Sequence, residues 1–111
     1  MNIQIIGTKK CNSTKKAVRF FKERNIPFYF VDLNERELSP GELSAITARI
    51  PASDLIDTES KLYKKKGYEY MEYDPMEEIM ENNLLMRTPV VRNGKLVTVG
   101  YDGSTWKEWL K

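Results

Sequence analysis

The sequence contains no histidine, and this absence removes several classes of functional site. Ser-His-Asp triads, Cys-His proteases and HExxH zinc sites all need an imidazole, which is also the usual general base near neutral pH. We expect no metal site. Only one cysteine, Cys11, is present, so an internal disulfide is excluded. Any redox reaction of Cys11 therefore needs a second thiol from another molecule.

Long apolar runs and an excess of one charge are also missing. No stretch approaches the roughly 20 apolar residues of a membrane span, and residues 1–6 lack the charged, apolar and cleavage regions of a signal peptide. Lys and Arg number 18 against 16 Asp and Glu, with the two signs interspersed. We therefore expect a cytoplasmic protein with neither a membrane nor a nucleic acid as its direct partner.

The pattern of apolar residues that is present predicts an α/β fold. A β-rich run at residues 3–6, a helical pattern at 14–24 and an aromatic, β-branched run at 28–33 predict a right-handed parallel strand–helix–strand unit. Capping signals then predict a helical insertion over about residues 39–84.

The last third of the chain predicts a hairpin followed by a helix. Asn93-Gly94 lies between β-rich runs at residues 90–92 and 95–99 and indicates a type I′ turn. Ser104 is expected to cap the final helix. The order βαβ, helices, ββα is that of thioredoxin-like folds, with a mixed sheet and helices on both faces. We expect one domain, residues 1–111.

Cys11 is the residue whose surroundings indicate chemistry. It precedes the first predicted helix, where unpaired N–H groups and the helix dipole favour an anion, and lysines flank it on both sides. Both effects favour the thiolate, which is the nucleophilic form. Asn12, Ser13 and Thr14 offer further donors to the sulfur or to a bound oxyanion. The alternative is a small buried apolar side chain, a common role for a lone cysteine.

Arg87, Thr88 and Pro89 precede the first hairpin strand. Arg87 offers a planar guanidinium to an oxyanion or a carboxylate, although a solvated arginine explains the sequence equally well. A proline at this place marks the start of a strand. General statistics do not favour a cis bond, because only about 5–6% of X–Pro bonds are cis.

Several segments together resemble the ArsC/Spx family, which groups ArsC-type arsenate reductases, related thiol reductases and the Spx regulators. In chain order they are Cys11-Asn12-Ser13-Thr14-Lys15-Lys16-Ala17, Asn25-Ile26-Pro27-Phe28, Asp54-Leu55-Ile56-Asp57-Thr58, Ser60-Lys61-Leu62-Tyr63 and Thr88-Pro89-Val90-Val91 with Val99-Gly100-Tyr101-Asp102. The resemblance implies a thioredoxin-like fold with a helical insertion and a nucleophilic Cys11. It also implies that Lys15 is the family's basic residue, that Arg87 lies near the arginine before the proline, and that Pro89 is a cis-proline opposite the cysteine.

The resemblance implies a thiol-dependent oxidoreductase without a bound cofactor. Arsenate reductases of the family attack arsenate with the cysteine and resolve the adduct with glutathione or glutaredoxin. Gly7 stands where those enzymes have a histidine, so a general thiol activity with glutathione as co-substrate is the leading hypothesis. The alternative is a Spx-like regulator that binds the RNA polymerase α subunit, although Thr14 replaces the second cysteine of the Spx Cys-x-x-Cys switch. A silent member with a vestigial cysteine is the third hypothesis.

Overall fold

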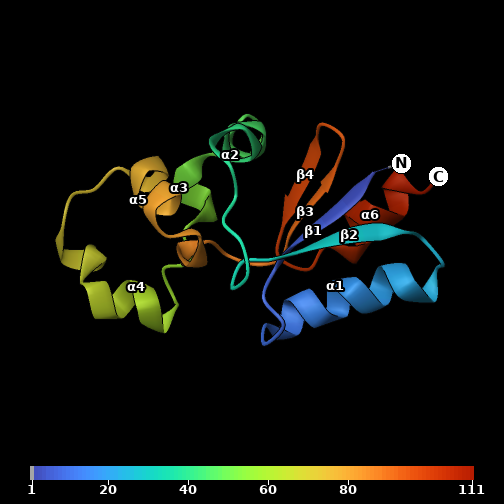
Figure 1. Ribbon diagram of the computed structural model, residues 1–111, viewed down its shortest axis with the longest axis horizontal. Coiled ribbons are helices and arrows are strands. Elements are labelled where there is room, and N and C mark those ends of the chain that lie inside the picture. The colour runs from blue at the N-terminus through green and yellow to red at the C-terminus, as the bar shows by residue number, and fades with distance from the viewer. Residues whose placement is uncertain (1) are drawn as a thin grey trace.

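The computed structural model describes residues 2–111, and its sheet begins with a parallel strand–helix–strand unit (Figure 1). Strand β1 (Ile3–Gly7) pairs in parallel with β2 (Phe28–Asp32), and helix α1 (Asn12–Glu23) connects them. Beyond the helix, Asn25 adopts the left-handed conformation with a φ of 55°. This residue ends the helix as predicted, since asparagine tolerates positive φ better than most side chains.

The second half of the sheet is the predicted hairpin. Strand β3 (Val90–Asn93) pairs antiparallel with β1 on one side and with β4 (Leu96–Val99) on the other. The strand order is β2-β1-β3-β4. This mixed sheet, with its element order, is the thioredoxin-like arrangement that the sequence predicts.

The hairpin turn differs from the prediction by one residue. Asn93 pairs with Leu96, so Gly94 and Lys95 are the central residues. Gly94 has a φ of 59°, whereas Lys95 is not among the residues with positive φ. A type I′ turn needs positive φ at both central positions, so the predicted turn type is wrong. Cross-strand pairing of Asn93 with Leu96 fixes this register and excludes Asn93 from the turn.

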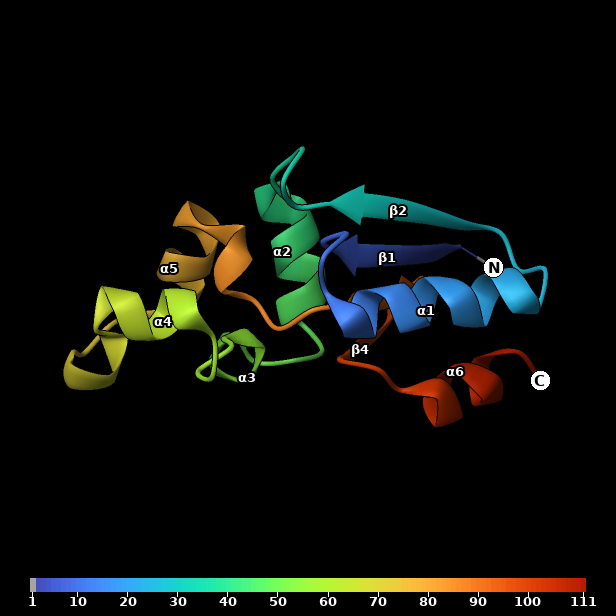
Figure 2. The same ribbon diagram turned by 90° about the horizontal axis from the view of Figure 1, so that it is seen from below.

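Helices α1 and α6 (Gly103–Trp109) cover one face of the sheet (Figure 2). Phe21 and Trp106 from these helices are fully buried against Ile5 and Val91 from the strands. Burial of such large side chains supplies most of the attraction between the two layers.

Helix α6 begins two residues earlier than expected. Asp102, and not Ser104, is its N-cap, and the Asp102 carboxylate accepts hydrogen bonds from the backbone N–H of Thr105 and from the hydroxyls of Ser104 and Thr105. An ionised acceptor is stabilised at the positive end of a helix. Ser104 therefore lies inside the helix, and its predicted capping role is wrong.

The opposite face of the sheet is covered at one end only. Helix α2 (Pro40–Thr47) opens with the predicted capping box of Ser39 and packs Leu43 against Ile6 of the sheet. Gln4 lies on the same face as Ile6, two residues earlier in the strand, and is half-buried. Helices are thus present on both faces, as expected. Helix α2 reaches as far as Gln4, whose Nε2 donates to Glu42 Oε2 at 3.4 Å, and beyond Gln4 this face has no helix over it (Figure 1).

The remaining helices lie beside the sheet and lengthen the molecule to 44 × 26 × 25 Å. They are short: α3 (Ala52–Leu55), α4 (Lys61–Lys66), α5 (Pro75–Glu81) and the 3-10 turns Tyr68–Tyr70 and Asn83–Leu85. The predicted caps are present at Ser60, Gly67 and Asp74. No helix within residues 2–111 is long and apolar enough to cross a membrane. We call α2 to α5 with the two 3-10 turns the helical lobe.

Asn83 ties the helical lobe to the chain that enters it. Its side chain is 4% exposed. Its Oδ1 accepts a hydrogen bond from the Leu38 N–H at 2.6 Å, and its Nδ2 donates to the Ile79 carbonyl at 2.7 Å. The Asn83 amide therefore links the segment at Leu38 to the end of helix α5 at Ile79.

Asn83→Ala should lower the free energy of unfolding by about 2–4 kcal/mol, because it leaves the Leu38 N–H and the Ile79 C=O buried without a partner. Urea denaturation measures this loss. Asn82→Ala is the matched control, since Asn82 caps only the exposed Leu84 N–H and should cost no more than about 1 kcal/mol. Equal losses for the two variants would contradict the role of Asn83.

Candidate functional site

Cys11 lies where β1 passes into α1, as the sequence predicts. Its N–H donates to the Thr8 carbonyl at 3.2 Å, and its own carbonyl accepts the Lys15 N–H at 3.0 Å. Cys11 is thus the N-cap residue, and its half-buried side chain makes no capping hydrogen bond. The sulfur lies beside the first turn of the helix, where backbone N–H groups lack helical partners.

Thr88 contacts the sulfur from the opposite side. The Thr88 hydroxyl donates to Cys11 Sγ at 3.2 Å, and the thiol lies 3.7 Å from the Thr88 carbonyl oxygen, to which it donates. The Thr88–Pro89 peptide is cis, the geometry that the family resemblance implies. The sequence indicated Thr88 only as part of the candidate cis-proline site. The sequence does not predict its hydroxyl as a hydrogen-bond donor to the sulfur, because 77 residues separate Thr88 from Cys11.

Hydrogen bonds lower the pKa of the Cys11 thiol below its ordinary value. Burial alone raises this pKa, but the hydroxyls of Thr14 and Thr88 and the backbone N–H groups of Thr14 and Ser13 outweigh burial. Each of these donors stabilises the charged sulfur. A larger fraction of Cys11 is therefore thiolate near neutral pH, as a nucleophile requires.

Thr14 and Gly7 pack against each other behind the cysteine. Thr14 is 1% exposed, and within residues 2–111 its hydroxyl has no hydrogen-bond partner of ordinary geometry. It is therefore available to donate to the sulfur once Cys11 loses its proton. A Cβ at Gly7 would lie 2.8 Å from Thr14 Cγ2 and closer still to the hydroxyl. Glycine at position 7 thus leaves the space that Thr14 fills.

Asn12, Lys15 and Arg87 have no described contact with the sulfur. The Arg87 guanidinium donates to the Asp54 carbonyl at 3.2 Å, and the Arg87 N–H donates to the Leu55 carbonyl at 2.6 Å. Lys15 is exposed and lies along a hollow between α1 and β2. Asn12 is exposed at the first helical position. Of the predicted anion-stabilising residues, the structure gathers Ser13, Thr14 and Thr88 around the sulfur.

The chain leaving the helical lobe pairs with the chain entering α3 and so positions Thr88. Ile56 and Met86 form an antiparallel bridge, and the Asp57 N–H donates to the Leu85 carbonyl at 2.8 Å. Such backbone pairs carry no side-chain signature, so they could not be predicted from the sequence. They hold the segment before Pro89 in place beside the start of α1.

Hollows flank α1 on two sides, and neither is lined by Cys11. One, of about 390 Å³, lies between α1 and β2 beside Thr14 and Lys15. The other, of about 660 Å³, lies between α1 and α6, farther along the helix. Within residues 2–111, no group of three or more His, Cys, Asp or Glu side chains is arranged to hold a metal ion.

The sequence profile of the ArsC family matches residues 6–109. The chain belongs to the ArsC family. Among curated proteins, the global transcriptional regulator Spx of Enterococcus faecalis is 29% identical over 113 residues, which cover 97% of this chain and 86% of that protein.

Solved structures of similar proteins confirm the fold of this ArsC-family chain. The YffB protein superposes with a TM-score of 0.87 at 18% identity, covering 98% of this chain and 99% of that one. An arsenate reductase from Vibrio cholerae superposes with a TM-score of 0.82 at 16% identity, covering 97% of each chain. At these identities the likeness shows a shared thioredoxin-like α/β fold.

Thr88→Val removes the hydroxyl donor while keeping the side-chain shape. The pKa of Cys11 should rise, because the thiolate loses a charge-assisted hydrogen bond. Alkylation by iodoacetamide at neutral pH should slow roughly three- to tenfold. Thr88→Ser keeps the hydroxyl and is the control. If the valine and native proteins show the same pH dependence of alkylation, Thr88 does not tune the sulfur.

Gly7→Ala tests the packing behind the cysteine. The added methyl must displace Thr14, so it should cost about 1–3 kcal/mol of stability and raise the pKa of Cys11. In a Thr14→Ala background the same change should cost much less, because the obstructing atoms are gone. Denaturation of the four proteins in this cycle gives the coupling. Additive costs would show that the two side chains do not compete for space.

Proposed function

We propose that this ArsC-family protein is a thiol-dependent oxidoreductase with Cys11 as its nucleophile. The observation that carries the proposal is the Thr88 hydroxyl, which donates to Cys11 Sγ at 3.2 Å. A sulfur used only for packing needs no donors to its charged form, whereas Cys11 has several, and its pKa is lowered. Activation of a cysteine by a lowered pKa is a general way to make a nucleophile.

A disulfide is the proposed substrate class. The Cys11 thiolate attacks one sulfur of the disulfide, a bond forms between that sulfur and Cys11, and the other sulfur leaves as a thiolate. An external thiolate, from glutathione or from a glutaredoxin, then attacks the sulfur attached to Cys11 and releases Cys11 as a thiolate. The two electrons come from external thiols, because this chain has no second cysteine. Thr14 and Thr88 stabilise Cys11 as the leaving group of the second step.

Arsenate is a less suitable substrate for this site. The one arginine predicted to hold the oxyanion, Arg87, directs its guanidinium to the Asp54 carbonyl. The methyl and hydroxyl of Thr14 fill the space that Gly7 leaves behind the cysteine. A multiply charged oxyanion such as arsenate is held most strongly where charged donors such as arginine contact it. The donors that surround Cys11 are neutral and suit a sulfur better.

A second candidate function is a Spx-like regulator that binds the RNA polymerase α subunit. Its support is the 29% identity with a protein named as a global transcriptional regulator, Spx, over 97% of this chain. In this role Cys11 is a redox sensor with a single thiol, and the chain itself is not an enzyme. The two functions make opposite predictions for a Cys11→Ser variant.

Oxidised glutathione should form a single adduct on Cys11, seen by mass spectrometry, and excess glutathione should remove it. Glutathione-dependent reduction of hydroxyethyl disulfide should fall to background in Cys11→Ser. The control is Ser13→Ala, which keeps the thiol and the Ser13 N–H. If no adduct forms and the thiol ionises at the ordinary value of about 8.5, the enzyme proposal fails. Co-purification of polymerase that survives Cys11→Ser, without any turnover, favours the regulator.

A further inference from the structure

Strand β2 is an edge strand without the usual protection. It pairs only with β1, so the N–H and C=O groups on its free side have no partner strand. Proteins commonly protect such edges with lysine, proline, a bulge or a covering segment. β2 itself contains neither lysine nor proline and pairs with β1 without a bulge, and Pro27 directly precedes its first residue. Figure 2 shows no other described segment beyond its free side.

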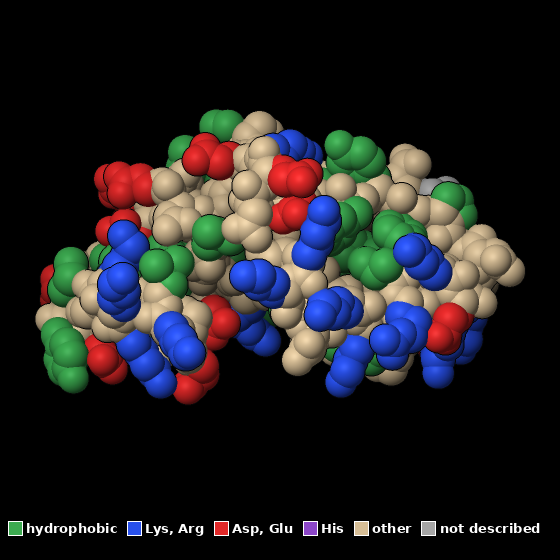
Figure 3. All heavy atoms as spheres, turned by 60° about the horizontal axis from the view of Figure 1, so that its bottom comes forward, with side chains coloured by type: hydrophobic (Ala, Val, Ile, Leu, Met, Phe, Trp, Pro, Cys, Tyr) green, Lys and Arg blue, Asp and Glu red, His purple; other side chains and the backbone are tan. Residues whose placement is uncertain are grey.

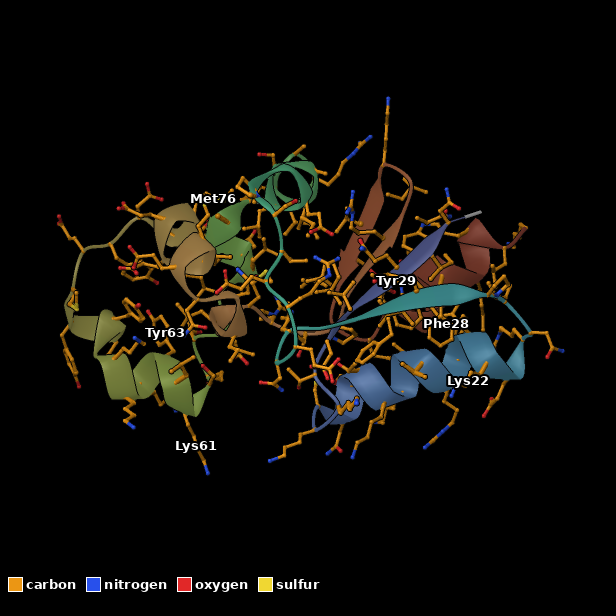
Figure 4. All side chains as sticks on the ribbon, in the orientation of Figure 1. Lys22, Phe28, Tyr29, Lys61, Tyr63 and Met76 are labelled. Carbon is orange, nitrogen blue, oxygen red and sulfur yellow. The ribbon has the colours of Figure 1, made fainter. Side chains whose placement is uncertain are left out.

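The α1 side of this edge is an apolar hollow with a basic rim. Its floor consists of the half-buried side chains of Val18, Phe28 and Phe30, and its volume is about 390 Å³. Lys15 and Lys22 stand on its rim, spaced by two helical turns, and neither has an ion-pair partner among the described residues. Figure 3 shows apolar side chains here between basic ones, and Figure 4 shows Lys22 on α1 beside Phe28 on β2.

The other side of the same edge has a second hollow. Tyr29 points to this side and is 61% exposed. The hollow, of about 570 Å³, is lined by Gln4, Tyr29 and Arg92. Arg92 donates from one guanidinium nitrogen to Gln4 Oε1 at 3.0 Å, while its buried Nε has no partner within residues 2–111. Helix α2 reaches the border of this hollow, where Gln4 Nε2 donates to Glu42 Oε2 at 3.4 Å, and leaves the rest of it uncovered.

A free edge with a hollow on each side is the arrangement that an added strand requires. Successive side chains of a strand point to opposite faces of the sheet, so an added strand needs space on both. No acidic residue lines either hollow, and the nearby carboxylates already have partners or are buried. Glu42, next to Gln4, pairs with Arg36, Glu35 pairs with Lys9, and Asp32 at the end of β2 is buried. Lys15 and Lys22 supply positive charge on one side and Arg92 on the other. The complementary strand is therefore apolar where it faces Val18 and acidic next to the lysines.

A second copy of this chain is a poor occupant. A symmetric antiparallel pair of β2 strands would bring two α1 helices side by side on one face of the joined sheet. The Lys15 and Lys22 side chains of the two copies would then approach one another with no carboxylate in the hollows. Like charges at such an interface oppose association.

We propose that the β2 edge binds an extended acidic segment of a partner protein by strand addition. Backbone hydrogen bonds to β2 provide the affinity. The two hollows and the cations beside them determine which partner sequences bind. The sequence pattern that fits the α1 side is acidic, apolar, acidic at alternate positions. Two acidic residues four positions apart in a strand are separated by about 13 Å, close to the roughly 10.5 Å between Lys15 and Lys22 along the helix, and the apolar residue between them faces Val18. Thr14, a donor to the Cys11 sulfur, also lines the α1-side hollow, but the attachment to β2 does not involve the thiol.

The blocked peptide Thr-Glu-Thr-Val-Thr-Glu-Thr is the probe, because its second, fourth and sixth residues present this pattern on one face. Added to the isotope-labelled protein, it should shift the amide NMR signals of β2 and of the α1 residues around Lys22, and slow the hydrogen exchange of β2 amides. Lys22→Glu should weaken binding roughly fivefold or more. Lys61→Glu is the matched control, since Lys61 is an exposed lysine on α4 in the helical lobe, and it should leave binding unchanged.

Two further peptides separate strand addition from simple attraction of charge. The same peptide with alternate backbone amides methylated keeps every side chain but cannot pair with β2, and it should not bind. The peptide with lysine in place of glutamate should bind the native protein weakly and Lys22→Glu more tightly. The proposal is overturned if the methylated peptide binds equally, if Lys22→Glu has no effect, or if no signal moves at millimolar peptide. It is also overturned if sedimentation shows a dimer of this chain that blocks the edge.

Discussion

The site depends on one contact between distant parts of the chain, the hydrogen bond from the Thr88 hydroxyl to the Cys11 sulfur at 3.2 Å. Cys11 is placed by β1 and α1, whereas Thr88 is placed by the backbone pairs at the exit of the helical lobe. The sheet joins the two because β3, which begins just after Thr88, lies directly beside β1. The helical lobe therefore contributes to the site, because its exit segment places the Thr88 hydroxyl against the Cys11 sulfur.

The local parts of this arrangement could be predicted from the sequence. The strand–helix–strand unit, the caps at Ser39, Ser60 and Asp74, and the position of Cys11 before a helix all rest on residues close together in the chain. The turn at Gly94 was placed one residue too early because strand pairing, and not the Asn-Gly signal alone, sets its register. Local signals are reliable where no distant partner competes with them.

The parts that could not be predicted depend on distant or atomic contacts. The Thr88 donor comes from 77 residues away, and the contact between Gly7 and Thr14 is visible only once the strand and the helix are packed. Arg87 illustrates the reverse case, since its side chain suits an oxyanion but donates to the Asp54 carbonyl. A residue type in a pattern indicates what a side chain is able to do, whereas packing decides which partner it meets.

The most direct test of a tuned cysteine is the ionisation of Cys11 itself, followed by the ultraviolet absorbance of the thiolate in native and in urea-unfolded protein. A pKa lowered by the fold means that ionised Cys11 stabilises the native state above the unfolded pKa, and that this stabilisation is lost as the pH falls through the native pKa. We predict that the native thiol ionises at lower pH than the unfolded one, whose value is about 8.5. Ionisation at the same or a higher pH in the native protein would contradict the role assigned to Thr14 and Thr88.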